Sequence, residues 1–372
     1  MRYLADFLKK DLNKKMVFLG GPRQCGKTTL AKAILKDNKG IYLNWDRIPD
    51  QKVILNEGWS DQDSLVVLDE IHKYPRWKNL VKGYFDTSKE KHQFLITGSA
   101  RLDVYRRSGD SLLGRYHYWR LHPFTLHEPI KGIRAKDAFE RLLSVGGFPE
   151  PFLDANPIES RRWREERHDR ILRDDIRDLE NVKKIQLMGL LLQLLRERVG
   201  GPINVLNLAT DLQVSPATVS HWIEIFERMY LIFVVRPYSR NLPRSLVKPF
   251  KIYFYDNADV IGDESARFEN LVATHLLKEM NFLQDSSGER WDLNYVRNKE
   301  GHEVDFVLVR DRTVVELIEA KWSDPKPSKS LLYFGEKIGV PKITQMVGTL
   351  KTSTTKNKLS IIHPIDRFLP LG

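Results

Sequence analysis

The chain is poor in cysteine and has no long apolar segment. Cys25 is the only cysteine among 372 residues, so no disulfide can form within the chain, and a reducing, cytoplasmic setting is expected. No run of about 18 uncharged apolar residues occurs, which excludes a transmembrane helix and argues against a membrane partner. The first residues, MRYLADFLKKDLNKK, also lack the apolar core of a secretory signal.

Internal repeats and low-complexity tracts are missing as well, which excludes a solenoid. What is present is an ordinary globular composition, with 41% hydrophobic and 29% charged residues. The length suggests roughly two to three domains. Lys and Arg number 60 against 49 Asp and Glu, and the net charge of +11 permits binding to a polyanion such as DNA without requiring it.

The pattern of apolar runs divides the chain into three predicted domains, 1–130, 131–245 and 246–372. In the first, short apolar runs alternate with helical stretches, which predicts a doubly wound α/β domain with a parallel sheet. The expected strands are Met16–Leu19, Gly40–Leu43, Leu65–Leu68 and Phe94–Thr97. The second domain is predicted to be helical. In the third, strands return after a long amphipathic helix, which predicts another α/β domain.

A phosphate-binding motif follows the first expected strand. It matches the pattern G-x4-G-K-[ST] between the strand MVFLG and the helix TTLAKAIL. Its glycines allow backbone N–H groups to turn toward a phosphate, its lysine can reach the terminal phosphates, and its threonine can bind Mg²⁺. The motif therefore predicts ATP and Mg²⁺ as cofactors. The residues expected at this site are Gly21, Pro22, Arg23, Gln24, Cys25, Gly26, Lys27, Thr28 and Thr29.

Polar side chains also lie at the ends of two later expected strands, Leu65–Leu68 and Phe94–Thr97. Asp69 is expected to hold Mg²⁺ beside Thr28, and Glu70 to polarise the water that attacks the γ-phosphate. The carboxyl ends of parallel strands share one edge of a sheet, so Thr97 or Ser99 is a candidate to contact the γ-phosphate or the attacking water. A solvated turn after either strand is the simpler alternative.

These motifs resemble the AAA+-type ATPase domain of a bacterial and archaeal family usually called "predicted ATPase". The resemblance rests on GGPRQCGKTTL, LVVLDEIHKYPRW, FLITGSAR and GRYHYWRLHPFTLHE, and it extends through GGFPEPFL, FENLVATHLLKE, GHEVDFVL and ELIEAK. It implies that Ser99 or Thr97 senses the γ-phosphate, and that an arginine, here Arg115, completes the site from a neighbouring subunit or domain. Arg115 can equally pair with an acid such as Glu128 and hold its own domain together.

The sequence Asp69-Glu70-Ile71-His72 also resembles the acidic box of DEAH-type helicases. Such a helicase needs a second motor lobe, and no second nucleotide-binding pattern follows residue 130. We therefore give this resemblance less weight and interpret His72 as a solvated or helix-capping residue.

The segment Val205–Phe226 has helix-turn-helix spacing and resembles a winged-helix fold. Ser215 can cap the second helix, whose polar face can meet DNA. That face carries Glu224 and is weak in cations, and winged helices also dock proteins. DNA contact and protein docking are therefore equal alternatives for this segment.

Four polar residues toward the C-terminus have the pattern of a metal-dependent nuclease. Asp305, Glu319 and Lys321 lie on a predicted β-hairpin, and Glu269 lies on the helix before it. Carboxylates with a lysine suit Mg²⁺ and a phosphodiester, and the pattern resembles the PD-(D/E)xK, or restriction-endonuclease-like, fold. The alternative is a domain that keeps the fold without cutting, with its acids in a buried ion-pair cluster.

Together these features predict an Mg²⁺-dependent ATPase whose nucleotide state controls a winged-helix region and a nuclease-like region, with DNA as the partner. Two alternatives stay open: a nucleotide-dependent signalling switch that binds proteins, and an ATP-regulated DNA nuclease. A second copy of the chain, or another protein, is a further candidate partner.

Overall fold

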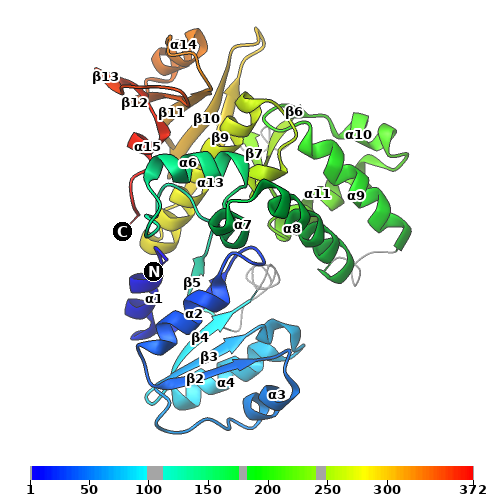
Figure 1. The fold of residues 1–372 in the computed structure, drawn as a ribbon, viewed down its shortest axis with the longest axis vertical. Helices are drawn as coiled ribbons and strands as arrows, with labels where there is room; N and C mark the ends of the chain where they lie inside the picture. Colours follow the sequence, from blue (N-terminus) through cyan, green and yellow to red (C-terminus); the bar gives the residue numbers. More distant parts are fainter. Residues whose placement is uncertain (1, 99–111, 176–181, 240–248, 372) are drawn as a thin grey trace. The chain divides into compact units, whose positions relative to one another are not determined.

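The computed structural model describes residues 2–98, 112–175, 182–239 and 249–371 (Figure 1). Its contacts divide them into two compact units. The first runs up to Pro123, and the three residues Arg228–Tyr230 are grouped with it; the second runs from Phe124 to Leu371. In these ranges, no helix combines the length and the apolarity needed to cross a bilayer.

The first unit is built on a five-stranded sheet in the order β2-β3-β4-β1-β5, with every pair of neighbours parallel. This confirms the α/β domain with a parallel sheet. Its strands are β1 Met16–Gly20, β2 Gly40–Asn44, β3 Leu65–Asp69, β4 Gln93–Thr97 and β5 Tyr116–Arg120. Its helices are α1 Ala5–Leu12, α2 Lys27–Lys36, α3 Ile48–Leu55, the 3₁₀ turn η1 Ile71–Lys73 and α4 Trp77–Ser88.

Apolar side chains on both faces explain why this sheet lies inside the unit. On one face, Phe18, Val66 and Ile96 pack with Trp77 and Val81 of the α4 region. Successive side chains along a strand point to opposite faces, so the alternate residues of the same strands face the other way. Helices α1 and α2 pack on these strands (Figure 1). Because these helices pack on the faces of the sheet, the carboxyl ends of its strands can carry polar residues.

The second unit contains most of the helices. Several begin at side chains that accept backbone N–H bonds: Asn156 caps α8, Asn204 caps α10 and Asp263 caps α13. Ser215 accepts a bond of 3.1 Å from the N–H of Thr218, as expected for a cap of α11. The helices are α6 Ala135–Ser144, α7 Pro149–Asp154, α8 Pro157–Arg170, the π-helical turn η2 Ile171–Asp175, α9 Val182–Arg196, α10 Val205–Asp211, α11 Pro216–Arg228, the 3₁₀ turn η3 Asn257–Asp259, α13 Glu264–Ser287, α14 Lys329–Ile338 and α15 Pro364–Arg367.

A nine-stranded mixed sheet forms the rest of this unit, in the order β13-β14-β12-β11-β10-β9-β7-β8-β6. Strands β9, β10 and β11 form an antiparallel meander, and β12 and β14 continue it in parallel. The strands are β6 Pro202–Ile203, β7 Ile232–Pro237, β8 Phe250–Phe254, β9 Trp291–Arg297, β10 Glu303–Arg310, β11 Thr313–Lys321, β12 Lys342–Val347, β13 Thr354–Lys356 and β14 Leu359–Ile362.

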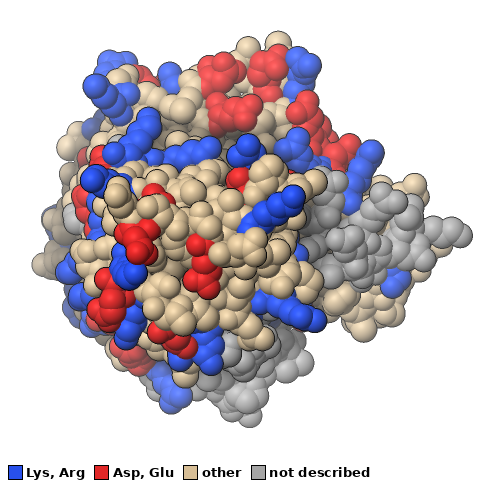
Figure 2. All heavy atoms as spheres, turned by 90° about the horizontal axis from the view of Figure 1, so that it is seen from below, with Lys and Arg blue, Asp and Glu red and all other residues tan. Residues whose placement is uncertain are grey.

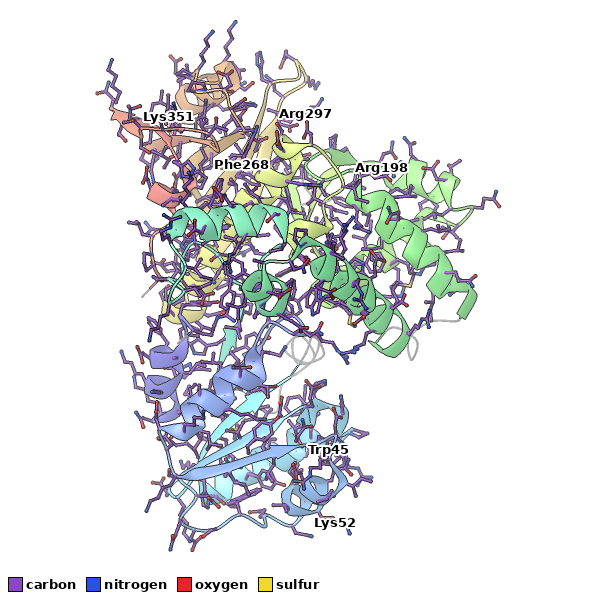
Figure 3. The ribbon with its side chains drawn as sticks, viewed as in Figure 1. Trp45, Lys52, Arg198, Phe268, Arg297 and Lys351 are labelled. Carbon is purple, nitrogen blue, oxygen red and sulfur yellow. The ribbon has the colours of Figure 1, made fainter. Side chains whose placement is uncertain are left out.

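Two apolar clusters cover opposite faces of the meander. Phe306 and Ile318 pack with side chains of α13, including Phe268, which is labelled in Figure 3. Val307 and Leu317 instead pack with residues of α14. This alternation buries both faces of β10 and β11, so their few polar side chains lie in a largely apolar setting.

The sheet crosses the boundary expected near residue 245. Strand β7 pairs with β8 in antiparallel fashion and with β9 in parallel, so segments on both sides of that boundary share one sheet. The division of the chain into 1–130, 131–245 and 246–372 stays a prediction.

Candidate functional site

The phosphate-binding motif forms a tight loop between β1 and α2. Gly21 has a φ of 138°, and a Cβ atom placed on it would lie 2.3 Å from the carbonyl oxygen of Leu121. Gly26 has a φ of 97° and leads directly into α2. Only glycine fits both requirements without strain, so the loop backbone depends on these two positions.

The lysine of the motif closes this loop. Lys27 is buried, and its Nζ donates to the carbonyl oxygens of Gly21 at 2.9 Å and Pro22 at 2.6 Å. Cys25 is also buried, whereas Gln24 and Thr29 are exposed and Arg23 is half-buried. The ammonium group is thus held at the loop, beside the first turn of α2.

Asp69 lies next to the loop at the end of β3. It is 2% exposed, and its Oδ2 accepts a hydrogen bond of 2.7 Å from Oγ1 of Thr28. Its Oδ1 accepts a hydrogen bond from Oγ1 of Thr97, the last residue of β4. The structure therefore brings Thr28 and Asp69 together at the carboxyl edge of the sheet.

Tyr42 is a residue of this site that sequence reasoning missed. Its hydroxyl donates to the same Oδ2 of Asp69 at 2.6 Å, and Nζ of Lys32 lies 4.4 Å from the centre of its ring. Burial, and then the hydrogen bond to Asp69, raise the pKa of Tyr42. The tyrosine therefore stays protonated and keeps donating. Only the pairing of β2 with β3 brings it there, and no local motif marks it.

Glu70 follows Asp69 in an unusual backbone conformation. Its φ of 57° is in the left-handed region, which a non-glycine residue adopts at a cost of about 1–3 kcal/mol. Its Oε2 lies 3.6 Å from Nε2 of His72 and 3.7 Å from Nζ of Lys73. Burial raises the pKa of Glu70, while the charges of Lys73 and Lys27 oppose that rise. Because His72 is only 4% exposed, its interpretation as a solvated residue is wrong.

Of the two residues predicted to contact the γ-phosphate, Thr97 and Ser99, the structure describes only Thr97. Thr97 is fully buried and bonded to Asp69, so its hydroxyl holds the carboxylate. Ser99 lies outside the described residues.

Arg115 lies at the opposite edge of the sheet from the phosphate loop. Its carbonyl accepts from the N–H of Met16, at the amino end of β1, whereas the loop follows Gly20 at the carboxyl end. Its side chain pairs with Asp86, with Nε–Oδ1 and Nη2–Oδ2 distances of 2.7 and 3.1 Å. The alternative, in which Arg115 pairs with an acid of its own domain, is therefore observed, but the acid is Asp86 and not Glu128, which bonds to Lys278 at 2.7 Å.

The C-terminal candidates lie around a second residue that sequence reasoning missed, the buried Lys251 of β8. Its Nζ lies 2.7 Å from Oε1 of Glu303, 3.4 Å from Oε1 of Glu269 and 3.6 Å from Oδ1 of Asp305. Burial alone would lower the pKa of Lys251, but the three carboxylates outweigh it and raise that pKa.

The other candidates extend this cluster toward β11. Oδ2 of Asp305 accepts from the N–H of Ala320 at 2.9 Å, and Lys321 pairs with Oε1 of Glu319 at 2.8 Å. Burial, and then the charge of Asp305, raise the pKa of both Glu269 and Glu319 to about 7. Among the described residues, no group of three Asp, Glu, His or Cys side chains is arranged to hold a metal ion.

The helix-turn-helix segment has the expected buried face. Val219, Trp222, Ile223 and Phe226 of α11 are buried, while His221 and Glu224 are exposed. From Val205 to Glu227 the sequence contains no Lys or Arg.

Figure 2 shows one face of the molecule, on which basic and acidic side chains are interspersed rather than gathered by sign.

Three segments of the chain match known protein families. Residues 13–130 match the family described as AAA domain. Residues 136–258 and 264–368 match two domains of unknown function, DUF8612 and DUF4143.

Among curated relatives, an uncharacterized protein of Mycobacterium tuberculosis is 25% identical over 262 residues, covering 68% of this chain and 57% of the relative. The chain thus spans little more than half the length of that relative. An uncharacterized protein of Methanocaldococcus jannaschii is 22% identical over 403 residues, covering 89% of this chain and 82% of the relative.

Among solved structures, a RuvB variant of Thermotoga maritima is 17% identical, covers 62% of this chain and 88% of its own, and has a TM-score of 0.32. A signal-transduction ATPase with numerous domains from Pyrococcus horikoshii is 14% identical, covers 74% and 45%, and has a TM-score of 0.21. TM-scores this low carry no argument about the fold. The family match and the geometry of the phosphate loop together identify residues 13–130 as an AAA-type P-loop ATPase domain.

Proposed function

We propose that the first unit hydrolyses ATP with Mg²⁺. The observation that carries this proposal is the hydrogen bond of 2.7 Å between Thr28 and Asp69, directly beside the phosphate loop. Mg²⁺ is commonly bound by one or two protein oxygens together with phosphate oxygens and water, so a single hydroxyl and a single carboxylate fit it. When bound, the ion would neutralise charge that develops on the transferred phosphoryl group.

The other groups of the site would have separate roles in binding and hydrolysis. The loop N–H groups and the N-terminus of α2 would hold the phosphates, with Lys27 as the neighbouring positive charge. Glu70 would accept a proton from the attacking water, and its raised pKa makes it a better base than an exposed glutamate. Ser99 remains our candidate for contact with the γ-phosphate.

Steady-state ATP turnover tests these roles. We expect Lys27→Ala to abolish ATP binding and turnover, and Asp69→Asn to remove the response to Mg²⁺. Glu70→Gln should keep ATP binding and lower the turnover rate by a factor of about 10² to 10⁴, the range of general base catalysis. Lys52→Ala, on α3, is the matched lysine control. Undiminished turnover by Lys27→Ala would refute the proposal.

We also propose that Arg115 acts on the site of a second copy of the chain. The register of β1 and β5 supports this, because it sets Arg115 and the loop at opposite ends of β1, on the order of 13 Å apart along the strand. A mixing experiment tests it: Glu70→Gln and Arg115→Ala should each be inactive alone and should recover part of the activity together. No recovery, with both variants folded, would rule out this role.

Nucleotide state would reach the rest of the chain through the segment that leaves β5. The loop packs against that segment, since Sγ of Cys25 lies 3.4 Å from the carbonyl oxygen of Leu121. Arg2 donates to the carbonyl oxygens of both Cys25 and His122. A change in loop geometry on ATP binding would therefore act directly on residues 121–122.

DNA is the partner that we propose for the second unit. The helix-turn-helix segment, which resembles a winged helix, supports it, although residues 124–372 hold only 37 Lys and Arg against 35 Asp and Glu. DNA binding should weaken steeply with salt, and duplex or single-stranded DNA should stimulate ATP turnover.

The second candidate is a nucleotide-dependent switch that binds a protein. The absence of Lys and Arg from Val205 to Glu227 favours it, because contact with phosphates needs cations. Little DNA affinity at about 0.1 M salt, and turnover that is indifferent to DNA, would support the switch.

An ATP-regulated nuclease is the third candidate. The observation in its favour is Oε2 of Glu319, which is buried and has no hydrogen-bond partner among the described residues. Mg²⁺-dependent DNA cleavage that Lys321→Ala abolishes and Lys27→Ala does not would support it.

A further inference from the structure

Glu269, Glu303 and Asp305, which we call the carboxylate cluster, surround a single ammonium group. The cluster joins two elements, since Glu269 lies on α13 and the other two residues lie on β10. Lys251 approaches from β8, and its side chain is 1% exposed, while those of the three acids are 13–23% exposed.

Four groups suited to a cation lie near this ammonium group. Nζ of Lys251 lies within 3.6 Å of an oxygen of each carboxylate and 5.5 Å from the ring centre of Tyr295 on β9. Tyr253, two residues along the same face of β8, donates to Oε1 of Glu269 at 2.6 Å. Strand β8 thus presents two donors to one carboxylate.

We infer that Lys251 is the resident cation of the carboxylate cluster: its ammonium group takes the space that a divalent ion would need between the three carboxylates, and it closes the cluster to metals. A divalent ion binds carboxylate oxygens at about 2.0–2.6 Å, so it would have to take the space that Nζ occupies. Moving Lys251 aside would leave a buried charge without its partners, which is strongly unfavourable.

This inference argues against the nuclease candidate, and the role that follows for the cluster is structural rather than hydrolytic. Lys251 belongs to the segment 136–258 that matches one family, and all three acids belong to the segment 264–368 that matches another. The cluster therefore fastens these two segments together inside one unit. The carboxylate cluster is separate from the phosphate loop. The inference about Lys251 and the ATPase proposal can therefore each fail without affecting the other.

Charge predicts what removal of the ammonium group would do. Without Lys251, the three carboxylates would keep two nearby cations among the described residues: Arg297, labelled in Figure 3 and 3.3 Å from Oε2 of Glu303, and Lys321, whose charge acts on Asp305 and Glu269. Like charges this close favour the capture of a cation from solvent. Lys251→Met, which keeps the length of the side chain, should therefore open a divalent site.

The test measures Mn²⁺ binding without nucleotide, in chains that also carry Asp69→Asn so that the phosphate-loop site does not contribute. We expect Lys251→Met to bind one Mn²⁺ at least about tenfold more tightly than its parent, and Glu269→Gln to remove this gain. Lys321→Met is the matched control, because Lys321 forms its ion pair with Glu319 and its loss leaves Lys251 at the centre of the cluster; this control also removes a cation whose charge acts on Asp305 and Glu269.

Two results would overturn the inference. The first is a folded Lys251→Met chain, judged by circular dichroism, that gains no Mn²⁺ affinity. The second needs no lysine variant: Mn²⁺ binding by the chain with Lys251 intact that is lost in Asp305→Asn would show that the cluster takes a metal in its native form. Should Lys251→Met fail to fold, this second comparison decides.

Discussion

Asp69 ends β3 and Asp305 lies within β10, and the two carboxylates differ in what surrounds them. Asp69 accepts hydrogen bonds from three neutral hydroxyl groups, those of Thr28, Tyr42 and Thr97. Asp305 instead lies beside the ammonium group of Lys251. Neutral donors orient a carboxylate without cancelling its charge, whereas an ammonium group does both. At the scale of single residues, we therefore expect Asp69, and not Asp305, to accept a metal ion.

Tyr42 is a positioning residue for Asp69, and its hydroxyl can be removed without changing the ring. We expect Tyr42→Phe to raise the Mg²⁺ concentration for half-maximal ATP turnover by about tenfold, because loss of a hydrogen bond behind a metal ligand weakens metal binding to that extent. The melting temperature should change little. The control is Tyr333→Phe, at an exposed tyrosine of the second unit. A Mg²⁺ curve that superimposes on that of the native chain would exclude this role.

At the scale of elements, two buried histidines fasten the segment that begins the second unit onto α13. The N–H of Leu126 donates to Nε2 of His275 at 2.9 Å, and Nε2 of His127 lies 3.3 Å from the carbonyl oxygen of His275. His127 also contacts the carbonyl oxygen of Leu369, beyond α15, through Nδ1 at 2.7 Å. Burial lowers the pKa of His127 from its ordinary 6.5 to about 4, and it lowers the pKa of His275 as well. Both rings are neutral in the folded chain at pH 7.

The contacts of these two histidines make the free energy of unfolding depend on pH. The contribution of neutral His127 is complete above pH 6.5 and is lost as the pH falls toward 4, since the unfolded chain takes up the proton first. Between pH 7.5 and 5, His127 should account for a loss of about 2 kcal/mol in the free energy of unfolding. Urea titrations of His127→Gln should show a shallower loss, and those of exposed His302→Gln should follow the native chain.

How far the sequence predicts these elements depends on how local their determinants are. The strands Leu65–Asp69 and Gln93–Thr97 follow from short apolar runs, and the phosphate loop from eight consecutive residues. The proximity of Thr28 and Asp69 follows from parallel strands ending at one edge. Tyr42 and Lys251 reach their sites only through the pairing of strands, and a lysine in the apolar run KIYFYD gives no local sign of the acids it will meet.

At the scale of the whole molecule, the described chain has two compact units with separate apolar cores. We expect calorimetry to show two unfolding transitions. A nonhydrolysable ATP analogue with Mg²⁺, at about 100 times its dissociation constant, should stabilise the first unit by about 2.7 kcal/mol. Lys27→Ala should cancel that shift. A single transition, or a shift that survives in Lys27→Ala, would contradict this expectation.

The direction of the strands in the first unit has a kinetic consequence. All five run the same way, so the phosphate loop and Arg115 lie at opposite edges of the sheet of the first unit. If Arg115 contributes to hydrolysis, it acts at the phosphate loop of a second copy of the chain. Specific activity would then rise with enzyme concentration and fall on dilution. The concentration of the enzyme, more than that of ATP, would set the rate of ATP hydrolysis.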